Sequence, residues 1–160
     1  ELTQADLKFA QNHLRIMSGL HGLLRPLDLI KPYRLEMGTK LSVRGKKDLY
    51  AFWGDEITDR LNVALQASGN DTLVNLASGE YFKAVNTKKL KANIITPVFK
   101  DMKNGQLKVI FLWAKQARGM MSGYILRNKI NNAEDLKGFE DGGYRFTPDL
   151  SDDRTWVFTR

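Results

Sequence analysis

A pair of glycines set three residues apart indicates a turn able to hold an anion. Gly19-Leu-His-Gly22 follows an apolar stretch and precedes Arg25. Glycine lets backbone N–H groups approach a phosphate closely, because no Cβ stands in the way. A helix before this turn and a short helix after it would make a helix–hairpin–helix-like element, in which His21 contacts the phosphate. The same residues equally fit an ordinary helix C-cap followed by a turn, with His21 as a surface or core side chain.

The second candidate site lies at the start of a helix predicted over residues 116–129. Lys115, Arg118 and Ser122 share one face of this segment at helical spacing. Cations at the start of a helix oppose the helix dipole, so an anion should compensate them. Either a bound phosphate or a buried carboxylate would satisfy this requirement, and we favour the phosphate.

Asn75, Ser78 and Glu80 form a third candidate, a polar site where a strand is predicted to lead into a helix. Backbone N–H groups at a helix N-terminus point toward ligands. Ser78 is more simply an N-cap residue, and Glu80 would serve as a general base only with a partner group. No second carboxylate stands at a matching spacing, so we assign no catalytic residue. An enzyme acting on damaged nucleic acid or a phosphorylated small molecule remains the alternative function.

The fourth candidate is the segment from Lys31 to Lys40, in which proline and glycine favour an irregular loop. Its cations Lys31, Arg34 and Lys40 are clustered, and such loops often carry function. A structural role is the alternative, in which Arg34 pairs with Glu36 or with the acidic residues 55–59.

Positive charge is unevenly distributed along the 160 residues, whose net charge is +7. Residues 25–47 carry +5 and residues 83–118 carry +8, while the intervening residues 48–82 carry −5. Two basic segments brought together by folding would attract phosphates and release their counterions. The simpler alternative is that lysines solubilise exposed strands. We expect the basic segments to bind the phosphate backbone of a nucleic acid.

Several other functions lack the residues they require. The chain has no cysteine, which excludes disulfides, thiolate metal sites and cysteine nucleophiles, and only His13 and His21 offer imidazole. We therefore expect no metal site and no cofactor, and no P-loop or dinucleotide-binding motif is present. No apolar run approaches the length of a membrane span, so no membrane association is expected.

Apolar periodicity predicts one α+β domain over residues 1–160, in which a mixed sheet with a β-hairpin packs against several helices. A capping box at Thr3 and Asp6 starts a helix that should end near residue 18. The hairpin is expected from Asn104-Gly105, and Pro97 indicates an edge position or a bulge in its first strand. The further predicted elements are helices at 48–68, 80–85 and 116–129 and strands at 34–41, 72–77, 93–102, 106–115, 144–146 and 155–159.

Seven segments in a fixed order resemble the YaaA family of bacterial peroxide-stress-resistance proteins. They are Leu24–Leu29, Pro32–Gly38, Phe52–Asp55, Asn75–Lys83, Pro97–Phe99, Ala114–Met121 and Trp156–Phe158. The opening Ser-Pro-Ala-Lys segment of the family has no counterpart, so the chain resembles roughly the last two-thirds of a full-length member.

The resemblance implies a cytoplasmic protein that limits unincorporated iron and protects DNA during hydrogen peroxide stress. It also implies binding of double-stranded DNA through a positive cleft beside a helix–hairpin–helix element. Phosphate contacts carry no sequence information, so we expect little sequence preference. The residues expected to hold DNA are Gly19, His21, Gly22, Arg25, Lys31, Arg34, Lys40, Lys115 and Arg118.

Overall fold

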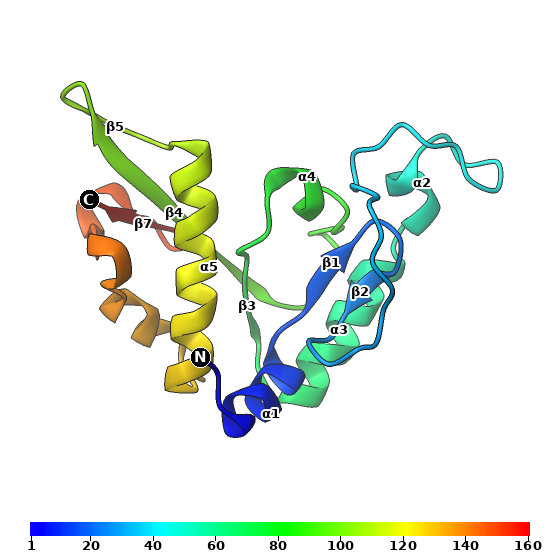
Figure 1. Ribbon diagram of the computed structural model, residues 1–160, viewed down its shortest axis with the longest axis horizontal. Coiled ribbons are helices and arrows are strands. Elements are labelled where there is room, and N and C mark those ends of the chain that lie inside the picture. Colours follow the sequence, from blue (N-terminus) through cyan, green and yellow to red (C-terminus); the bar gives the residue numbers. More distant parts are fainter. The chain divides into compact units, whose positions relative to one another are not determined.

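Helices and strands in the computed structural model, which describes residues 1–160, fall into two units (Figure 1). The first unit comprises residues 1, 3–71 and 77–92, and the second unit comprises residues 2, 72–76 and 93–160. A mixed sheet, a small hairpin sheet and several helices make this an α+β protein, which confirms the predicted fold class. None of its helices has both the length and the apolar character needed to cross a bilayer.

The first unit is mainly helical and contains one small hairpin. Its elements are α1 (Gln4–His13), β1 (Ile16–Ser18), β2 (Gly22–Leu24), α2 (Leu49–Trp53), α3 (Glu56–Ser68) and α4 (Gly79–Phe82). The predicted capping box is present, because the Thr3 hydroxyl accepts from the Asp6 N–H and the Asp6 carboxylate accepts from the Thr3 N–H.

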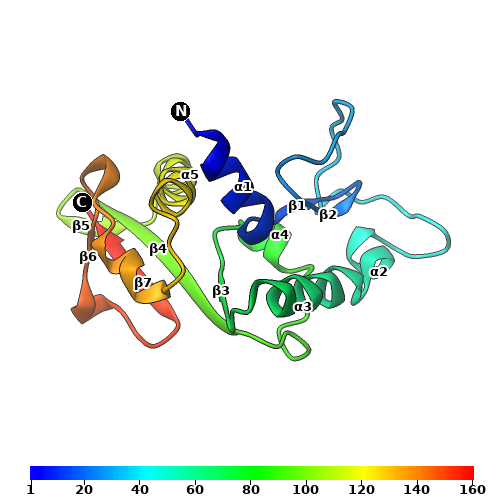
Figure 2. The ribbon, with the colours of Figure 1, turned by 90° about the horizontal axis from the view of Figure 1, so that it is seen from below.

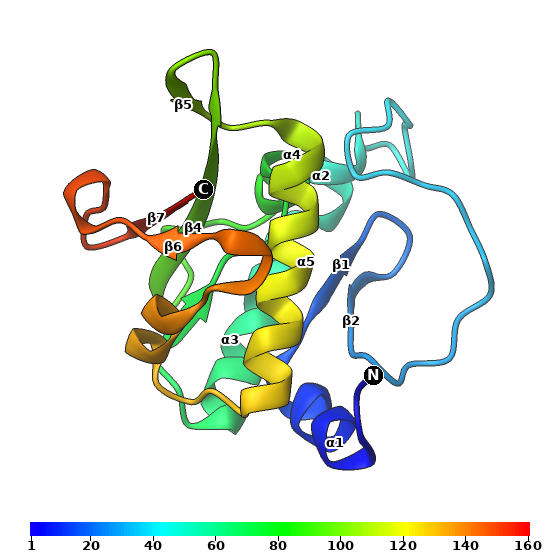
Figure 3. The same cartoon turned by 60° about the vertical axis from the view of Figure 1, so that its left-hand side comes forward.

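Helix α1 ends at His13, and the chain then turns into a β-hairpin. Ile16 pairs with Leu24 and Ser18 pairs with Gly22, whose positive φ of 73° reverses the chain. The prediction that the first helix reaches residue 18 is therefore wrong. Residues 25–47 contain no helix, so the expected helix–hairpin–helix-like element is not confirmed. Figure 3 shows this long irregular segment between β2 and α2, and the strand predicted at 34–41 is absent from it.

The helix predicted over residues 48–68 is divided into α2 and α3. Asp48 caps α2 by accepting the Ala51 N–H at 2.7 Å. Gly54 then adopts φ 51° and ψ −121°, a conformation that ends the helix and suits only glycine. Gly69, with φ 71°, ends α3 as the sequence predicts.

The second unit is built on a mixed sheet in the strand order β3-β4-β7-β6, with β5 also paired to β4. Strands β3 and β7 run parallel to β4, whereas β5 is antiparallel to β4 and β6 to β7. Its strands and longest helix are β3 (Thr72–Val74), β4 (Asn93–Lys103), β5 (Gln106–Lys108), α5 (Phe111–Asn128), β6 (Arg145–Phe146) and β7 (Thr155–Thr159). Three 3-10 helices cover Ala133–Gly138, Asp141–Gly143 and Pro148–Leu150.

Pro97 lies in β4, which has neighbours on both sides. The Thr96 N–H donates to the Arg154 carbonyl beside β7, so the nitrogen of the next residue faces the opposite side. On this opposite side β4 pairs with β3, but the pairing extends only to Ile95. The last hydrogen bond there runs from the Asn75 N–H to the Ile95 carbonyl. Proline has no N–H to continue this ladder, so the strand is locally an edge at Pro97.

Helix α5 begins at Phe111, five residues before the predicted start. Strand β5 is correspondingly short, and the strand expected to continue to residue 115 is wrong beyond residue 108. Ala114, Ala117 and Met121 are buried at helical spacing. Because these side chains pack into the core, residues from Phe111 onward form a helix, although the alternating pattern before them predicted a strand. Figure 2 shows α5 nearly end-on beside β4.

A buried polar cluster completes the core of the second unit. The Tyr144 hydroxyl donates to both oxygens of the Asp101 carboxylate, at 3.1 and 2.9 Å, and the Arg160 Nε donates to one of them at 2.5 Å. Tyr144 and Asp101 are almost fully buried, and Phe99 packs edge-on against the Tyr144 ring. Burial, followed by the hydrogen bond to Asp101, raises the pKa of Tyr144 to about 12.

We predict that Tyr144→Phe destabilises the protein by about 1.5–3 kcal/mol at pH 8, because it removes a buried hydrogen bond to a charged group. The raised pKa means that the neutral phenol contributes stability that is complete below pH 10 and is lost as the pH rises toward 12. Denaturant unfolding across this range should show the difference between variant and wild type shrinking. Tyr124→Phe is the control, because the Tyr124 hydroxyl makes no hydrogen bond within the protein, and an equal loss in both variants would contradict the prediction.

Candidate functional site

The two glycines of the hairpin turn are packed tightly from both sides. The Trp53 Nε1–H donates to the Gly19 carbonyl at 3.0 Å. A Cβ on Gly22 would lie 2.8 Å from the Trp53 ring, and one on Gly19 would lie 2.6 Å from the Leu35 carbonyl oxygen. Both glycines are thus required by protein packing alone, whether or not a phosphate binds. Their role in DNA binding stays a prediction.

The loop after β2 is fastened to the hairpin by Ser18. The buried Ser18 hydroxyl accepts the His21 N–H at 2.9 Å and is 2.5 Å from the Tyr33 hydroxyl. The Tyr33 ring also packs edge-on against the half-buried His21 ring, with 5.3 Å between centroids. These contacts place the predicted site residues His21 and Arg34 on one small part of the first unit.

Glu80 forms a second fastening for the same loop. Its Oε1 accepts the Gly38 N–H at 2.8 Å, and its carbonyl accepts from the Tyr50 hydroxyl at 2.9 Å. Burial and the nearby Glu80 charge raise the pKa of Tyr50. The Lys83 ammonium lies 4.9 Å from the centre of the Tyr50 ring. Glu80 therefore holds the loop in place beside Lys83, a structural task for the residue considered as a general base.

The other two residues of the predicted polar site are Ser78, in the first unit, and Asn75, in the second unit. Ser78 stands at the N-cap position of α4, but its side chain makes no capping hydrogen bond. Asn75 is buried in the second unit at the end of β3, where its side-chain amide faces the Thr96 hydroxyl at 3.5 Å. Across the described chain, no group of three or more histidine, aspartate or glutamate side chains is arranged to hold a metal ion.

Most cations of the two basic segments have no carboxylate partner. Within residues 25–47 only Arg25 forms an ion pair, with Asp28, and within residues 83–118 only Lys89 does, with Asp55. Arg34 pairs neither with Glu36 nor with the acidic residues 55–59. The exposed cations of the loop without an ion pair are Lys31, Arg34, Lys40, Arg44, Lys46 and Lys47.

Lys115 and Arg118 belong to the second unit, on α5. Lys115 is exposed, and the Arg118 Nε donates to the Ala114 carbonyl at 3.3 Å. Because α5 begins at Phe111, these cations lie beyond its first turn. The argument that they oppose the helix dipole at its start is therefore wrong. Lys115 is exposed, Arg118 is partly exposed, and neither has a carboxylate partner, so both still suit an anion.

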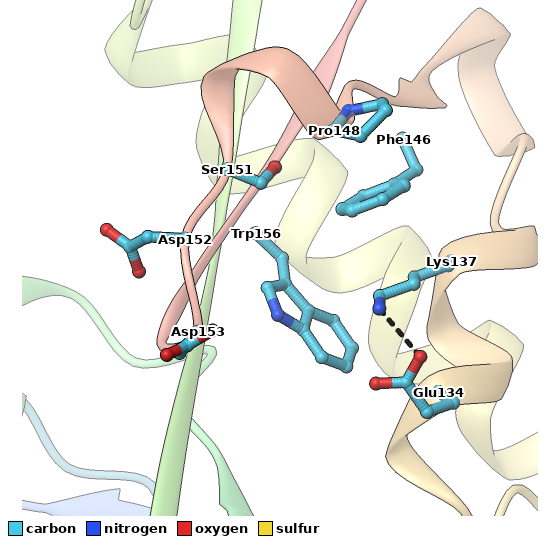
Figure 4. A pocket seen from close by; sticks show the side chains of 8 residues that line it. All are labelled: Glu134, Lys137, Phe146, Pro148, Ser151, Asp152, Asp153 and Trp156. Carbon is cyan, nitrogen blue, oxygen red and sulfur yellow. Dashed lines mark hydrogen bonds and ion pairs between the residues drawn. The ribbon is translucent and has the colours of Figure 1, made fainter.

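An open depression of about 340 Å³ in the second unit was not anticipated from the sequence (Figure 4). Phe146 and Trp156 form its aromatic wall, and the Lys137 ammonium lies 5.3 and 4.7 Å from their ring centres. Lys137 is also paired with Glu134 at 2.6 Å. The hydrogen bonds from the Arg154 and Thr155 N–H groups lower the pKa of Asp152. The Lys137 ammonium thus already makes cation–π contacts with both aromatic rings of this depression.

Known proteins similar to this chain carry two descriptions, one from a family model and one from individual relatives. The family model described as peroxide stress protein YaaA matches residues 1–150. A UPF0246 protein from Saccharophagus degradans is 58% identical over 158 residues, which are 99% of this chain and 62% of that protein. UPF0246 proteins from Aliivibrio fischeri strain MJ11 and Ralstonia nicotianae are each 57% identical, with 61% and 62% of their lengths covered. The chain spans about three-fifths of the length of these curated relatives.

The fold and the site together define a cysteine-free α+β protein with many unpaired surface cations. The comparisons identify the family within this class. The chain belongs to the peroxide stress protein YaaA family, also described as UPF0246, as its sequence segments indicated.

We predict that Gly22→Ala is more destabilising than Gly45→Ala. Both glycines have φ near 74°, so an alanine costs about 1–2 kcal/mol of backbone strain at either position. Only Gly22 faces the Trp53 ring, which should add about 1–3 kcal/mol of overpacking, while Gly45 has open space around it. Equal free energies of unfolding for the two variants would show that Trp53 does not constrain the turn.

A further prediction concerns the Gly38 amide. Glu80→Ala removes its acceptor and should increase its hydrogen-exchange rate, whereas Glu80→Gln keeps an oxygen in place and should largely preserve protection. Exchange measured by NMR reports on this single amide, and the backbone N–H of Ala51, bonded to Asp48, serves as an internal reference. Equal protection of Gly38 in the alanine and glutamine variants contradicts a fastening role for the Glu80 side chain.

Proposed function

We propose that this protein binds double-stranded DNA through its phosphate backbone as part of the defence against hydrogen peroxide. The observation that carries the proposal is the set of exposed cations without carboxylate partners in residues 25–47 and 83–118. Such cations repel one another, and a phosphate backbone relieves the repulsion while releasing condensed counterions. The pI of about 9.6 supports the same ligand class.

The arrangement of the basic loop in the first unit suits phosphate contacts more than base readout. Lys31, Arg34 and Lys40 extend from an irregular segment that is held at Tyr33 and Gly38. Phosphate contacts of this kind position a protein on the duplex without reading its sequence. We therefore propose binding with little sequence preference.

The link with peroxide comes from the family, which is described by its role in peroxide stress. We extend the proposal to a cytoplasmic protein that protects DNA from oxidative damage and limits unincorporated iron, as the resemblance implied. Duplex binding is assigned to side chains of this chain, so amino-acid substitutions test it directly.

Replacing Lys31, Arg34 and Lys40 together with glutamine should weaken duplex binding and flatten its salt dependence. Each lost phosphate contact lowers the slope of log affinity against log salt by about 0.9, so the slope should fall by about 2.7. Fluorescence anisotropy with duplexes of unrelated sequence at several salt concentrations measures both quantities.

The matched control replaces Arg60, Arg127 and Arg145 with glutamine, which removes the same charge from arginines that face Glu56, Asp141 and Glu140. This control should change the slope little. A wild-type affinity that does not respond to salt would refute the proposed function. Equal salt slopes for the two triple variants would show that Lys31, Arg34 and Lys40 do not contact the duplex.

A further inference from the structure

The β1–β2 hairpin places two arginines opposite one another at its open end. Its register pairs Ile16 with Leu24, so the preceding residue Arg15 stands across from the following residue Arg25. Like charges directly opposite on a hairpin are destabilising. The helix predicted up to residue 18 does not place Arg15 opposite Arg25, whereas the observed hairpin does.

Arg25 is held by a tight turn that also fixes one carboxylate. Pro26 occupies the second position of this turn, and the Asp28 N–H donates to the Arg25 carbonyl at 3.1 Å. The Asp28 Oδ2 accepts the Arg25 N–H at 2.8 Å, while Oδ1 lies 3.4 Å from the Arg25 guanidinium. The Gln11 side chain anchors the turn by accepting the Leu27 N–H at 3.1 Å.

Arg15 is held by the end of α1. One of its terminal nitrogens donates to the Gln11 carbonyl at 3.1 Å and to the Leu14 carbonyl at 2.8 Å. Burial and, next, the nearby Arg25 charge lower the pKa of Arg15. The Arg25 N–H hydrogen bond and, to a lesser extent, the charges of Arg25 and Arg15 lower the pKa of Asp28. The Asp28 carboxylate therefore pairs with Arg25, whereas Arg15 has no carboxylate partner.

We propose that Arg15 and Arg25 form a phosphate-binding site in which the Asp28 carboxylate competes with the phosphate. Guanidinium groups bind phosphate oxygens with charge-assisted hydrogen bonds, and both arginines have further donors beyond those used within the protein. Asp28 contacts the Arg25 guanidinium and repels an incoming anion. The proposal rests on the proposed function for its ligand, a phosphodiester of the DNA backbone, and it adds a built-in limit on affinity.

Asp28→Asn separates the two roles of this residue. The asparagine oxygen can still accept the Arg25 N–H and keep the turn, but the competing charge is gone. We expect duplex affinity to rise about tenfold at 50 mM salt, and the salt slope to steepen by about 0.9, as for one added phosphate contact. Asp149→Asn makes the same change in net charge at an exposed residue without a partner and should leave the slope unchanged. Arg15→Gln should flatten the slope by a similar amount.

The outcomes distinguish this inference from the function on which it rests. A wild type that does not bind duplex refutes the proposed function. The arginine site alone is overturned if the wild type binds duplex but the variants show no specific effect. In that case Asp28→Asn has the same affinity and salt slope as Asp149→Asn, and Arg15→Gln has the same values as the wild type. Inorganic phosphate is titrated in parallel while the arginine Nε–H resonances are followed by NMR. Shifts of Arg15 and Arg25 caused by phosphate and not by duplex would assign the site to a free phosphate and overturn the DNA assignment.

Discussion

The contact between Trp53 and the Gly19–Gly22 turn is the constraint on which the first unit's basic loop depends. Trp53 binds the turn through one hydrogen bond and fills the space that a side chain on Gly22 would need. The other face of the turn touches the backbone of Leu35. The turn is therefore packed between the Trp53 indole ring on one side and the loop residue Leu35 on the other. The cations of residues 25–47 therefore have defined positions, because this irregular segment packs against the Gly19–Gly22 turn.

Electrostatic pairing separates the structural charges of the chain from those left for a ligand. Asp55 binds Lys89 and the Asn86 amide, and Arg60 binds Glu56 along α3. These surface pairs are individually weak, because water screens exposed charges. None of the ion pairs formed by the carboxylates of residues 48–82 involves a cation of residues 25–47.

Local patterns predicted the parts of the fold that short-range interactions decide. The capping box at Thr3, the stop at Gly69 and the strand over residues 155–159 are confirmed. The errors lie where packing overrides pattern: Ile16–Ser18 form a strand because β2 pairs with them, and Phe111 starts a helix because Ala114 and Ala117 are buried. The same limit applies to the site. Cations were recognisable from composition, but the partners Asp28 and Glu80 depend on turns and on contacts across 42 residues, which spacing does not encode.

Pro97 has a consequence for the hydrogen-bond balance of the sheet. Strand β3 pairs with β4 as far as Ile95, and β5 pairs with β4 only from Asp101 onward. The short stretch of β4 between these pairings is therefore without a partner strand on that side. Pro97 is buried in this stretch, and a buried N–H without an acceptor would be costly. Because proline has no N–H, the residue at which the pairing stops leaves no donor to be satisfied.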